Sequence, residues 1–202
     1  HGYYRDYVDG TKDKIARAFS TGFIYQGEPS AHRVWAKRGE PSGGLPPTAF
    51  VDFLQNHDQI GNRALGDRLT SLVDGPALDA ALAVLLLAPM PPMMFMGEEW
   101  GSTRPFPFFC DFSGDLADAV RNGRRAEFAD AYADPALAVP DPLDGETFRA
   151  AKLDWGARSR GAHRRRLDLV RALLQVRRET VVPRLVGIAG FAASAEFAGD
   201  LL

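Results

Sequence analysis

Cysteine is almost absent from this chain of 202 residues. Cys110 is the only one, so no internal disulfide can form, and we expect a reducing, cytoplasmic compartment. An excess of charge is also lacking, since 24 Lys and Arg stand against 26 Asp and Glu, a formal net charge of −2. That balance creates no overall field to attract nucleic acid or an anionic membrane, so we expect neither as a partner.

Long hydrophobic runs are missing as well. The longest, residues 80–96, contains Pro89, Pro91 and Pro92 and does not reach the ~20 apolar residues of a membrane span. The opening HGYYRDYVDG has neither the basic start nor the apolar stretch of a signal peptide, and it has no initiator methionine. Because the chain also stops abruptly on FAGDLL, we expect it to be part of a longer protein.

Apolar periodicity predicts helices over 11–21, 74–88, 115–132 and 163–179. Gly22 would end the first, and Pro76 suits the first turn of the second. Residues 27–47 are rich in Gly, Pro, Ser and Arg and predict a long loop, whereas the sequence from Val181 onward predicts short strands of a second domain.

Two short apolar segments, TAFVDFL (48–54) and PPMMFM (91–96), predict buried strands, and each is followed at once by polar residues. The first is followed by QNHDQIGN (55–62) and the second by Glu98 and Glu99. A rhythm of strand, polar loop and helix is typical of parallel α/β proteins, in which the carboxyl ends of neighbouring strands open onto one face. The spacing therefore predicts that Asp58 and the Glu98–Glu99 pair line one pocket.

Several longer motifs resemble the α-amylase superfamily of glycoside hydrolases. More narrowly, they resemble the malto-oligosyltrehalose trehalohydrolases, which release trehalose from the end of a maltooligosyl chain. The motifs are FLQNHDQIGNRALGDRL, FMGEEWGSTRPFPFFCDFSGDLADAVRNGRRAEF, HGYY, FIYQG, VPDP and KLDW. The resemblance covers nearly the whole chain.

This resemblance implies an α/β fold in which a (β/α)8 TIM barrel is followed by a β-sandwich domain. Residues 1–180 would be the C-terminal part of the catalytic barrel, and residues 181–202 the truncated start of the C-terminal β domain. A complete barrel takes ~250 residues, and only two convincing barrel strands are evident here. The nucleophilic Asp and general-acid Glu of the family would both lie upstream of His1, so the chain alone would be inactive.

The resemblance also implies roles for individual residues. Asp58 would be the third catalytic carboxylate, which stabilises the transition state, and His57 would join it in holding sugar hydroxyls. The substrate, maltooligosyl trehalose or a related α-glucan, would contact a set that comprises His57, Asp58, Gln59, Ile60, Gly61, Asn62 and Glu99. We expect no cofactor. We also expect no metal at His57 and Asp58, since no second His or Cys falls at ligand spacing.

Structural alternatives exist for these residues. His57 and Asp58 suit a helix cap or turn, and Glu98 and Glu99 suit the cap of the helical turn that follows their strand. The aromatic residues of segment 100–109 suit either a core or the faces of sugars. The basic runs 122–125 and 163–166 are typical of solvated helix faces.

Two functional alternatives also stay open at this point. One is a glycogen branching or debranching enzyme of the same superfamily, and the other is a non-catalytic carbohydrate-binding or scaffold module.

Overall fold

The computed structural model describes residues 6–199, so the HGYY motif lies outside the described residues. The chain forms two compact units. The first unit is made of His1–Asp52, Leu86–Met93 and Leu174–Leu202, and the second of Phe53–Leu85 and Met94–Leu173. The polar stretch 55–62 and the Glu98–Glu99 pair both belong to the second unit.

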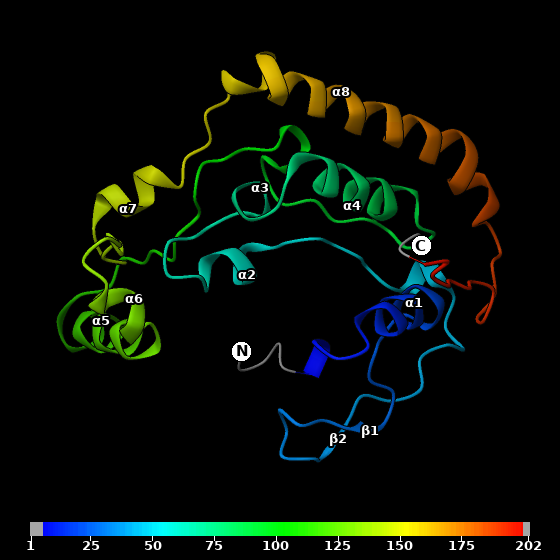
Figure 1. Ribbon diagram of the computed structural model, residues 1–202, viewed down its shortest axis with the longest axis horizontal. Coiled ribbons are helices and arrows are strands. Elements are labelled where there is room, and N and C mark those ends of the chain that lie inside the picture. The colour runs from blue at the N-terminus through cyan, green and yellow to red at the C-terminus, as the bar shows by residue number, and fades with distance from the viewer. Residues whose placement is uncertain (1–5, 200–202) are drawn as a thin grey trace. The chain divides into compact units, whose positions relative to one another are not determined.

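Helices account for most of the regular structure (Figure 1). They are α1 (Thr11–Thr21), α2 (His57–Gly61), α3 (Leu69–Leu72), α4 (Gly75–Leu87), α5 (Gly114–Glu127), α6 (Ala129–Ala133), α7 (Gly145–Ala150) and α8 (Gly161–Val176). Tight 3-10 turns are η2 (Pro47–Ala49), η3 (Glu98–Trp100), η4 (Ala157–Ser159) and η6 (Val182–Arg184), and η5 (Arg177–Val181) is a wider π turn. The strands β1 (Glu28–Pro29) and β2 (Lys37–Arg38) pair antiparallel.

The four predicted helices are present, with one correction. The first ends as expected at Gly22, whose N–H donates to the carbonyl of Ala18 at 2.8 Å. The segment 115–132 is not one helix but two, α5 and α6, because Phe128 leaves helical geometry with ψ at 38°. In Figure 1, α5 and α6 lie beside each other.

The two predicted strands are reduced to a single parallel bridge between Asp52 and Pro92. The Asp52 N–H donates to the carbonyl of Pro91 at 3.1 Å, and the Met93 N–H donates to the carbonyl of Asp52 at 2.8 Å. The predicted parallel orientation is therefore confirmed, whereas the predicted strand lengths are wrong. Proline explains part of the shortfall, because Pro91 and Pro92 have no N–H to donate to a longer ladder.

The prediction of strands after Val181 is also wrong for the described residues. Segment 181–199 continues from α8 through the helical turns η5 and η6 and then forms turns and irregular backbone without a regular strand. Its backbone docks by single hydrogen bonds within the first unit, as from the Phe191 N–H to the Gly43 carbonyl at 2.7 Å. The predicted loop 27–47 is confirmed apart from the two-residue strands β1 and β2.

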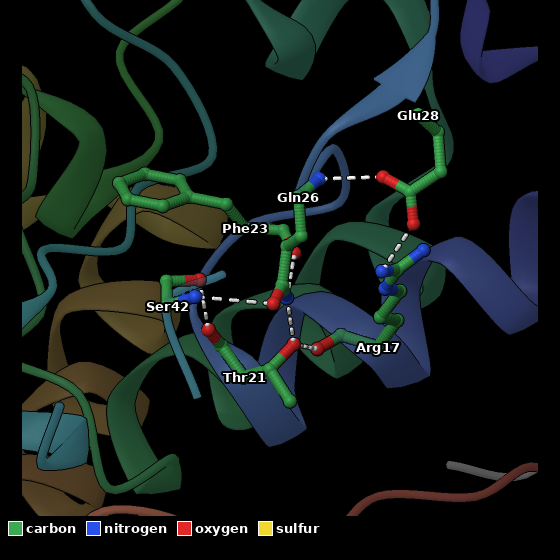
Figure 2. Close-up of polar contacts among 6 residues, drawn as sticks. All are labelled: Arg17, Thr21, Phe23, Gln26, Glu28 and Ser42. Atoms are coloured by element: carbon green, nitrogen blue, oxygen red, sulfur yellow. Dashed lines mark hydrogen bonds and ion pairs between the residues drawn. The ribbon is translucent and has the colours of Figure 1, made fainter. Parts of the chain in front are cut away.

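A hydrogen-bond network around Gln26 holds the start of that loop against α1 (Figure 2). The Gln26 side chain donates to the Thr21 hydroxyl and accepts from the Ser42 N–H at 3.1 Å. The Gln26 N–H donates to Glu28 at 2.6 Å, and Glu28 also pairs with Arg17. Side-chain bonds therefore replace a longer sheet in fixing this loop.

The core of the second unit is apolar, and its buried side chains come from several helices. They include Ile60 of α2, Leu78, Leu82 and Leu85 of α4, Trp100 of η3, Ala117 of α5 and Val170 of α8. Among the helices of residues 6–199, none is long and apolar enough to cross a membrane.

The basic runs are not wholly solvated, which corrects the prediction for two arginines. Arg124 and Arg166 each expose only 13% of the side chain. Arg166 pairs with Asp79 at 2.9 Å, and Arg124 donates to the Gly61 carbonyl at 3.1 Å. Each arginine therefore joins a helix to a segment distant in the sequence.

Candidate functional site

The polar stretch 55–62 begins with a capping box. Asn56, in extended conformation, accepts the Gln59 N–H on its Oδ1 at 3.0 Å. In return the Gln59 side chain accepts the Asn56 N–H on its Oε1 at 3.2 Å. These reciprocal bonds satisfy two donors that a helix start leaves unpaired, so they fix where α2 begins. The side chains of Asn56 and Gln59 thus serve the backbone.

His57 and Asp58 occupy the first two positions of α2 and face solvent. Their side chains are 70% and 73% exposed, and His57 Nε2 lies 3.4 Å from Asp58 Oδ1. The cap itself is Asn56, so the structural alternative of a cap does not apply to His57 or Asp58. An acidic residue in the first turn still benefits from the helix dipole. The geometry leaves both side chains free to contact a polar ligand.

The remaining residues of the stretch differ in accessibility. Ile60 and Gly61 are buried, and Gly61 offers only its carbonyl, which accepts from Arg124. Asn62 is exposed and follows the last turn of α2. We predict that the substrate contacts residues 57–62, and this stays a prediction. Within that range the exposed residues are His57, Asp58 and Asn62.

Gln55 is a residue that sequence reasoning missed. It is 3% exposed, and its amide donates from Nε2 to Glu98 Oε1 at 3.1 Å. Its Oε1 accepts the Leu69 N–H at 3.1 Å. Gln55 therefore ties the polar stretch 55–62 to the Glu98–Glu99 pair. The available signal was its place as the first polar residue after a predicted strand.

Glu98 is buried within the turn η3 and is 2% exposed. Burial raises the pKa of its carboxyl above the ordinary value, although hydrogen bonds from the Phe95 N–H and the Gln55 amide act in the opposite direction. The Phe95 N–H donates to Glu98 Oε2 at 3.0 Å. A carboxyl with these partners orients its neighbours rather than contacting a ligand.

Glycines on both sides of η3 determine how sharply the chain turns there. Gly97 has φ of 84° and Gly101 has φ of 65°, both in the left-handed region that favours glycine. A Cβ on Gly97 would lie 2.7 Å from the Leu153 side chain, and one on Gly101 would lie 2.9 Å from Arg166. Both glycines therefore also allow close packing.

Glu99 differs from Glu98 because it is only partly buried and lines a cavity of about 310 Å³. The other lining residues are Trp100, Trp155, Arg158, Ser159, Arg164, Leu167 and Arg171. Asp58 is not among them. That Asp58 and Glu99 contact the same bound substrate therefore stays a prediction.

Arg68 is a second residue that the sequence did not reveal. It is 1% exposed, and its guanidinium donates to the carbonyls of Arg104 at 2.5 Å and Met96 at 2.9 Å. Burial lowers its pKa, while the charges of Glu98 and Glu99 raise it. Arg68 joins the chain after α2 to both ends of the Glu98–Glu99 turn, so it acts as a positioning residue.

The described residues 6–199 contain no group of three or more His, Cys, Asp or Glu side chains arranged to hold a metal ion. What the second unit offers is an exposed carboxylate and imidazole at a capped helix start, together with a partly buried carboxylate beside two tryptophans. Such groups can accept and donate hydrogen bonds to hydroxyls, and aromatic faces can stack on sugar rings.

Comparison with known proteins agrees with this chemistry, although no family model matches the chain. The chain is 42% identical to the malto-oligosyltrehalose trehalohydrolase of Deinococcus radiodurans over 188 residues, which is 90% of the chain and 30% of that protein. It is 42% identical to the enzyme of that name from Rhizobium sp., over 98% of the chain and 33% of that protein. A crystal structure of a candidate α-amylase from Salmonella typhimurium superposes with a TM-score of 0.88 at 48% identity, covering 94% of this chain and 32% of that one.

Over the part that it spans, the chain is thus similar to glycoside hydrolases of the α-amylase superfamily, and its mainly helical α/β architecture agrees with the matched α-amylase structure. Within the superfamily, the predicted resemblance to the malto-oligosyltrehalose trehalohydrolases is confirmed. The chain spans about one third of the length of the relatives it matches.

Proposed function

We propose that this chain is part of a glycoside hydrolase that releases trehalose from maltooligosyl trehalose by cleaving the α-1,4 bond next to the trehalose end. The observation that carries the proposal is the match to a trehalohydrolase over 98% of the chain, a span that includes the polar stretch 55–62. In this proposal residues 1–180 are the C-terminal part of a (β/α)8 barrel. Residues 181–202 are the start of the β domain that follows it, although the described part, 181–199, forms no regular strand. The parallel bridge between Asp52 and Pro92 supports the barrel assignment.

Asp58 acts in this proposal as the transition-state stabiliser. Its side chain is 73% exposed on a helix start that Asn56 and Gln59 fix, so it is both accessible and positioned. His57 shares this position and provides a ring nitrogen for the same sugar. The nucleophile and the general acid would come from segments upstream of His1, as a retaining glycosidase needs two carboxylates on either side of the bond.

Product analysis tests this function. The natural protein that carries this chain is incubated with maltooligosyl trehalose and, separately, with a maltooligosaccharide that has no trehalose end. Release of trehalose from the first and little product from the second is expected. Hydrolysis of both at equal rates would indicate an α-amylase instead, and transfer of chains without hydrolysis would indicate a branching enzyme.

The coding frame upstream of His1 provides an independent test. A strand ending in Asp and a later strand ending in Glu are expected there. A start codon within a few residues of His1 would contradict the enzymatic proposal and favour a carbohydrate-binding module.

A further inference from the structure

The cavity beside Glu99, here named the Trp155 cavity, lies within the second unit. It is lined from the turn η3, from the segment around η4 and from α8. Its volume of about 310 Å³ is at the lower end of the range of small-molecule sites. A monosaccharide or disaccharide unit is of suitable size.

One wall of the cavity is aromatic. Trp155 is 57% exposed, unusually accessible for a large apolar ring. The ring of buried Trp100 lies 5.1 Å from it at an angle of 48°, and the guanidinium of Arg158 lies 5.5 Å from its centre. These contacts hold Trp155 in place, so stacking on it would cost little conformational freedom.

An unpaired donor adjoins the same wall. Trp100 is 2% exposed, yet its indole Nε1 has no hydrogen-bond partner. Such a buried N–H is unusual, since the indole donor of a buried tryptophan ordinarily finds an acceptor. Because that nitrogen is itself buried, Trp100 senses the cavity through the contact of its ring with Trp155 and not through a bond to a ligand.

The charges around the cavity are nearly balanced. Arg164 and Arg171 both pair with Asp168, at 2.7 Å and 3.2 Å. Glu99 adds a second carboxylate beside the three arginines of the wall. Because two of the three guanidinium groups already have an anionic partner, the cavity suits a neutral ligand with many hydroxyls better than a phosphate.

We propose that the Trp155 cavity binds a glucose unit of an α-glucan. Trp155 stacks on one face of the sugar ring. Glu99 accepts hydrogen bonds from the sugar hydroxyls, Arg158 donates to them, and Ser159 can do either. This assignment rests on the proposed function for the class of ligand, but it depends on residues other than His57 and Asp58.

Indole N–H resonances test the proposal without relying on activity. The natural protein is labelled with ¹⁵N-tryptophan, carries Asp58→Asn to stop turnover, and is titrated with maltoheptaose. The signals of Trp100, Trp155 and Trp35 are assigned by their loss in Trp→Phe variants. We expect the signals of Trp100 and Trp155 to shift with one common Kd. Trp35, 71% exposed on the loop between β1 and β2 and outside the cavity, is the matched control and should not shift.

Substitution of the stacking residue provides the second measurement. Trp155→Ala should weaken the Kd reported by the Trp100 signal by about 5- to 10-fold, the effect of one aromatic contact. Trp35→Ala should leave it unchanged. If neither Trp100 nor Trp155 responds to maltoheptaose, or if Trp155→Ala binds as tightly as its parent, the proposal is overturned. Shifts produced by inorganic phosphate but not by maltoheptaose would overturn it in favour of an anion site.

The result can be separated from that for the proposed function. If trehalose is released but the Trp100 and Trp155 signals do not shift, the glucan site is refuted and the proposed enzymatic function stands. If both signals shift in a protein that hydrolyses neither substrate, the glucan site stands and the proposed enzymatic function is refuted.

Discussion

The side chain of Gln55 donates to the carboxylate of Glu98, with 3.1 Å between Nε2 and Oε1, across 43 residues of sequence. The other end of the same amide accepts the Leu69 N–H at 3.1 Å. A flipped amide would set an oxygen against a carboxylate and a donor against a donor, so both partners fix its orientation. This contact brings together the two polar clusters that follow the Asp52–Pro92 bridge along the chain.

Asp58→Asn tests the catalytic role directly in the natural protein. As charge develops at the anomeric carbon, neighbouring hydroxyls donate more strongly to an ionised Asp58, and only this difference accelerates the reaction. We expect kcat to fall about 100- to 1,000-fold, the effect of one preorganised electrostatic contact, with a much smaller change in KM. The Tm should change little, because Asp58 is exposed and only its interaction with the helix dipole is lost. Asp115→Asn, in the exposed first turn of α5, is the matched control. A stable Asp58→Asn enzyme with near-normal kcat would end the assignment.

Asn56→Ala separates capping from catalysis. Loss of the cap that accepts the Gln59 N–H should destabilise the protein by about 1 kcal/mol and lower its Tm, because α2 loses its defined start. The kcat should fall less than in Asp58→Asn, since the carboxylate remains. Asn56→Ser, which keeps an acceptor, should recover most of the Tm in thermal melting. Equal melting of the alanine and serine variants would show that the cap contributes nothing.

The stability of the folded protein should change with pH because of the titration of Glu98. Burial raises its pKa above the ordinary 4.5, so between these values the folded protein keeps a proton that the unfolded chain has released. Stability should therefore decline as the pH rises from about 4.5 to the folded pKa, by at most about 1.4 kcal/mol per pH unit. Glu98→Gln should flatten Tm across that window.

Asp52 provides the comparison, because burial raises its pKa too. Asp52→Asn should remove the part of the pH dependence of stability that comes from Asp52 and leave the part that comes from Glu98. A Glu98→Gln protein with the full slope of the parent would contradict the assignment.

Arg124→Met tests the link between α5 and α2. The Arg124 guanidinium donates to the Gly61 carbonyl and lies 4.5 Å from the centre of the Phe128 ring. Loss of a hydrogen bond from a charged group costs about 1.5–3 kcal/mol, so the Tm should drop. Since Gly61 ends α2, KM should rise as well. Arg125→Met, at an exposed neighbour on the same helix, should change neither quantity in melting and steady-state assays.

The 202-residue chain expressed alone should be poorly soluble and should release no trehalose. Val51, Phe53, Met93 and Met96, beside the Asp52–Pro92 bridge in sequence, are 57%, 38%, 40% and 43% exposed. Apolar side chains next to unpaired strand backbone favour aggregation. Light scattering and a trehalose assay on the purified chain measure both effects. Turnover by this chain would show that no upstream carboxylate is needed.

The sequence predicts the helices well because their information is local. The apolar spacing of α1, α4 and α8 and the glycine after α1 are sufficient. It misses the interruption after α5, where Phe128 has ψ of 38° and its ring lies 4.5 Å from the guanidinium of Arg124. Strand lengths fail for a different reason, since pairing depends on partners far away in the sequence.

The site shows the same division. The motif predicts that His57 and Asp58 matter, and the structure finds them exposed at a fixed helix start. The roles of Gln55 and Arg68 could not be predicted, because each depends on hydrogen-bond partners at least 14 residues away. A lone glutamine or arginine in a sequence does not reveal such partners.

Arg177, in the wide turn after α8, is buried to 8% exposure and donates to the carbonyls of Leu86 at 3.1 Å and Met90 at 2.8 Å, and also to that of Ala88. These carbonyls lie at and beyond the end of α4, where a helix leaves its acceptors unpaired. One guanidinium thus links two segments about 90 residues apart in the sequence by hydrogen bonds alone. A protease cut in the exposed segment 134–138 would leave the carbonyls on one piece and Arg177 on the other. The two pieces should therefore still elute together under native conditions and separate only in denaturant.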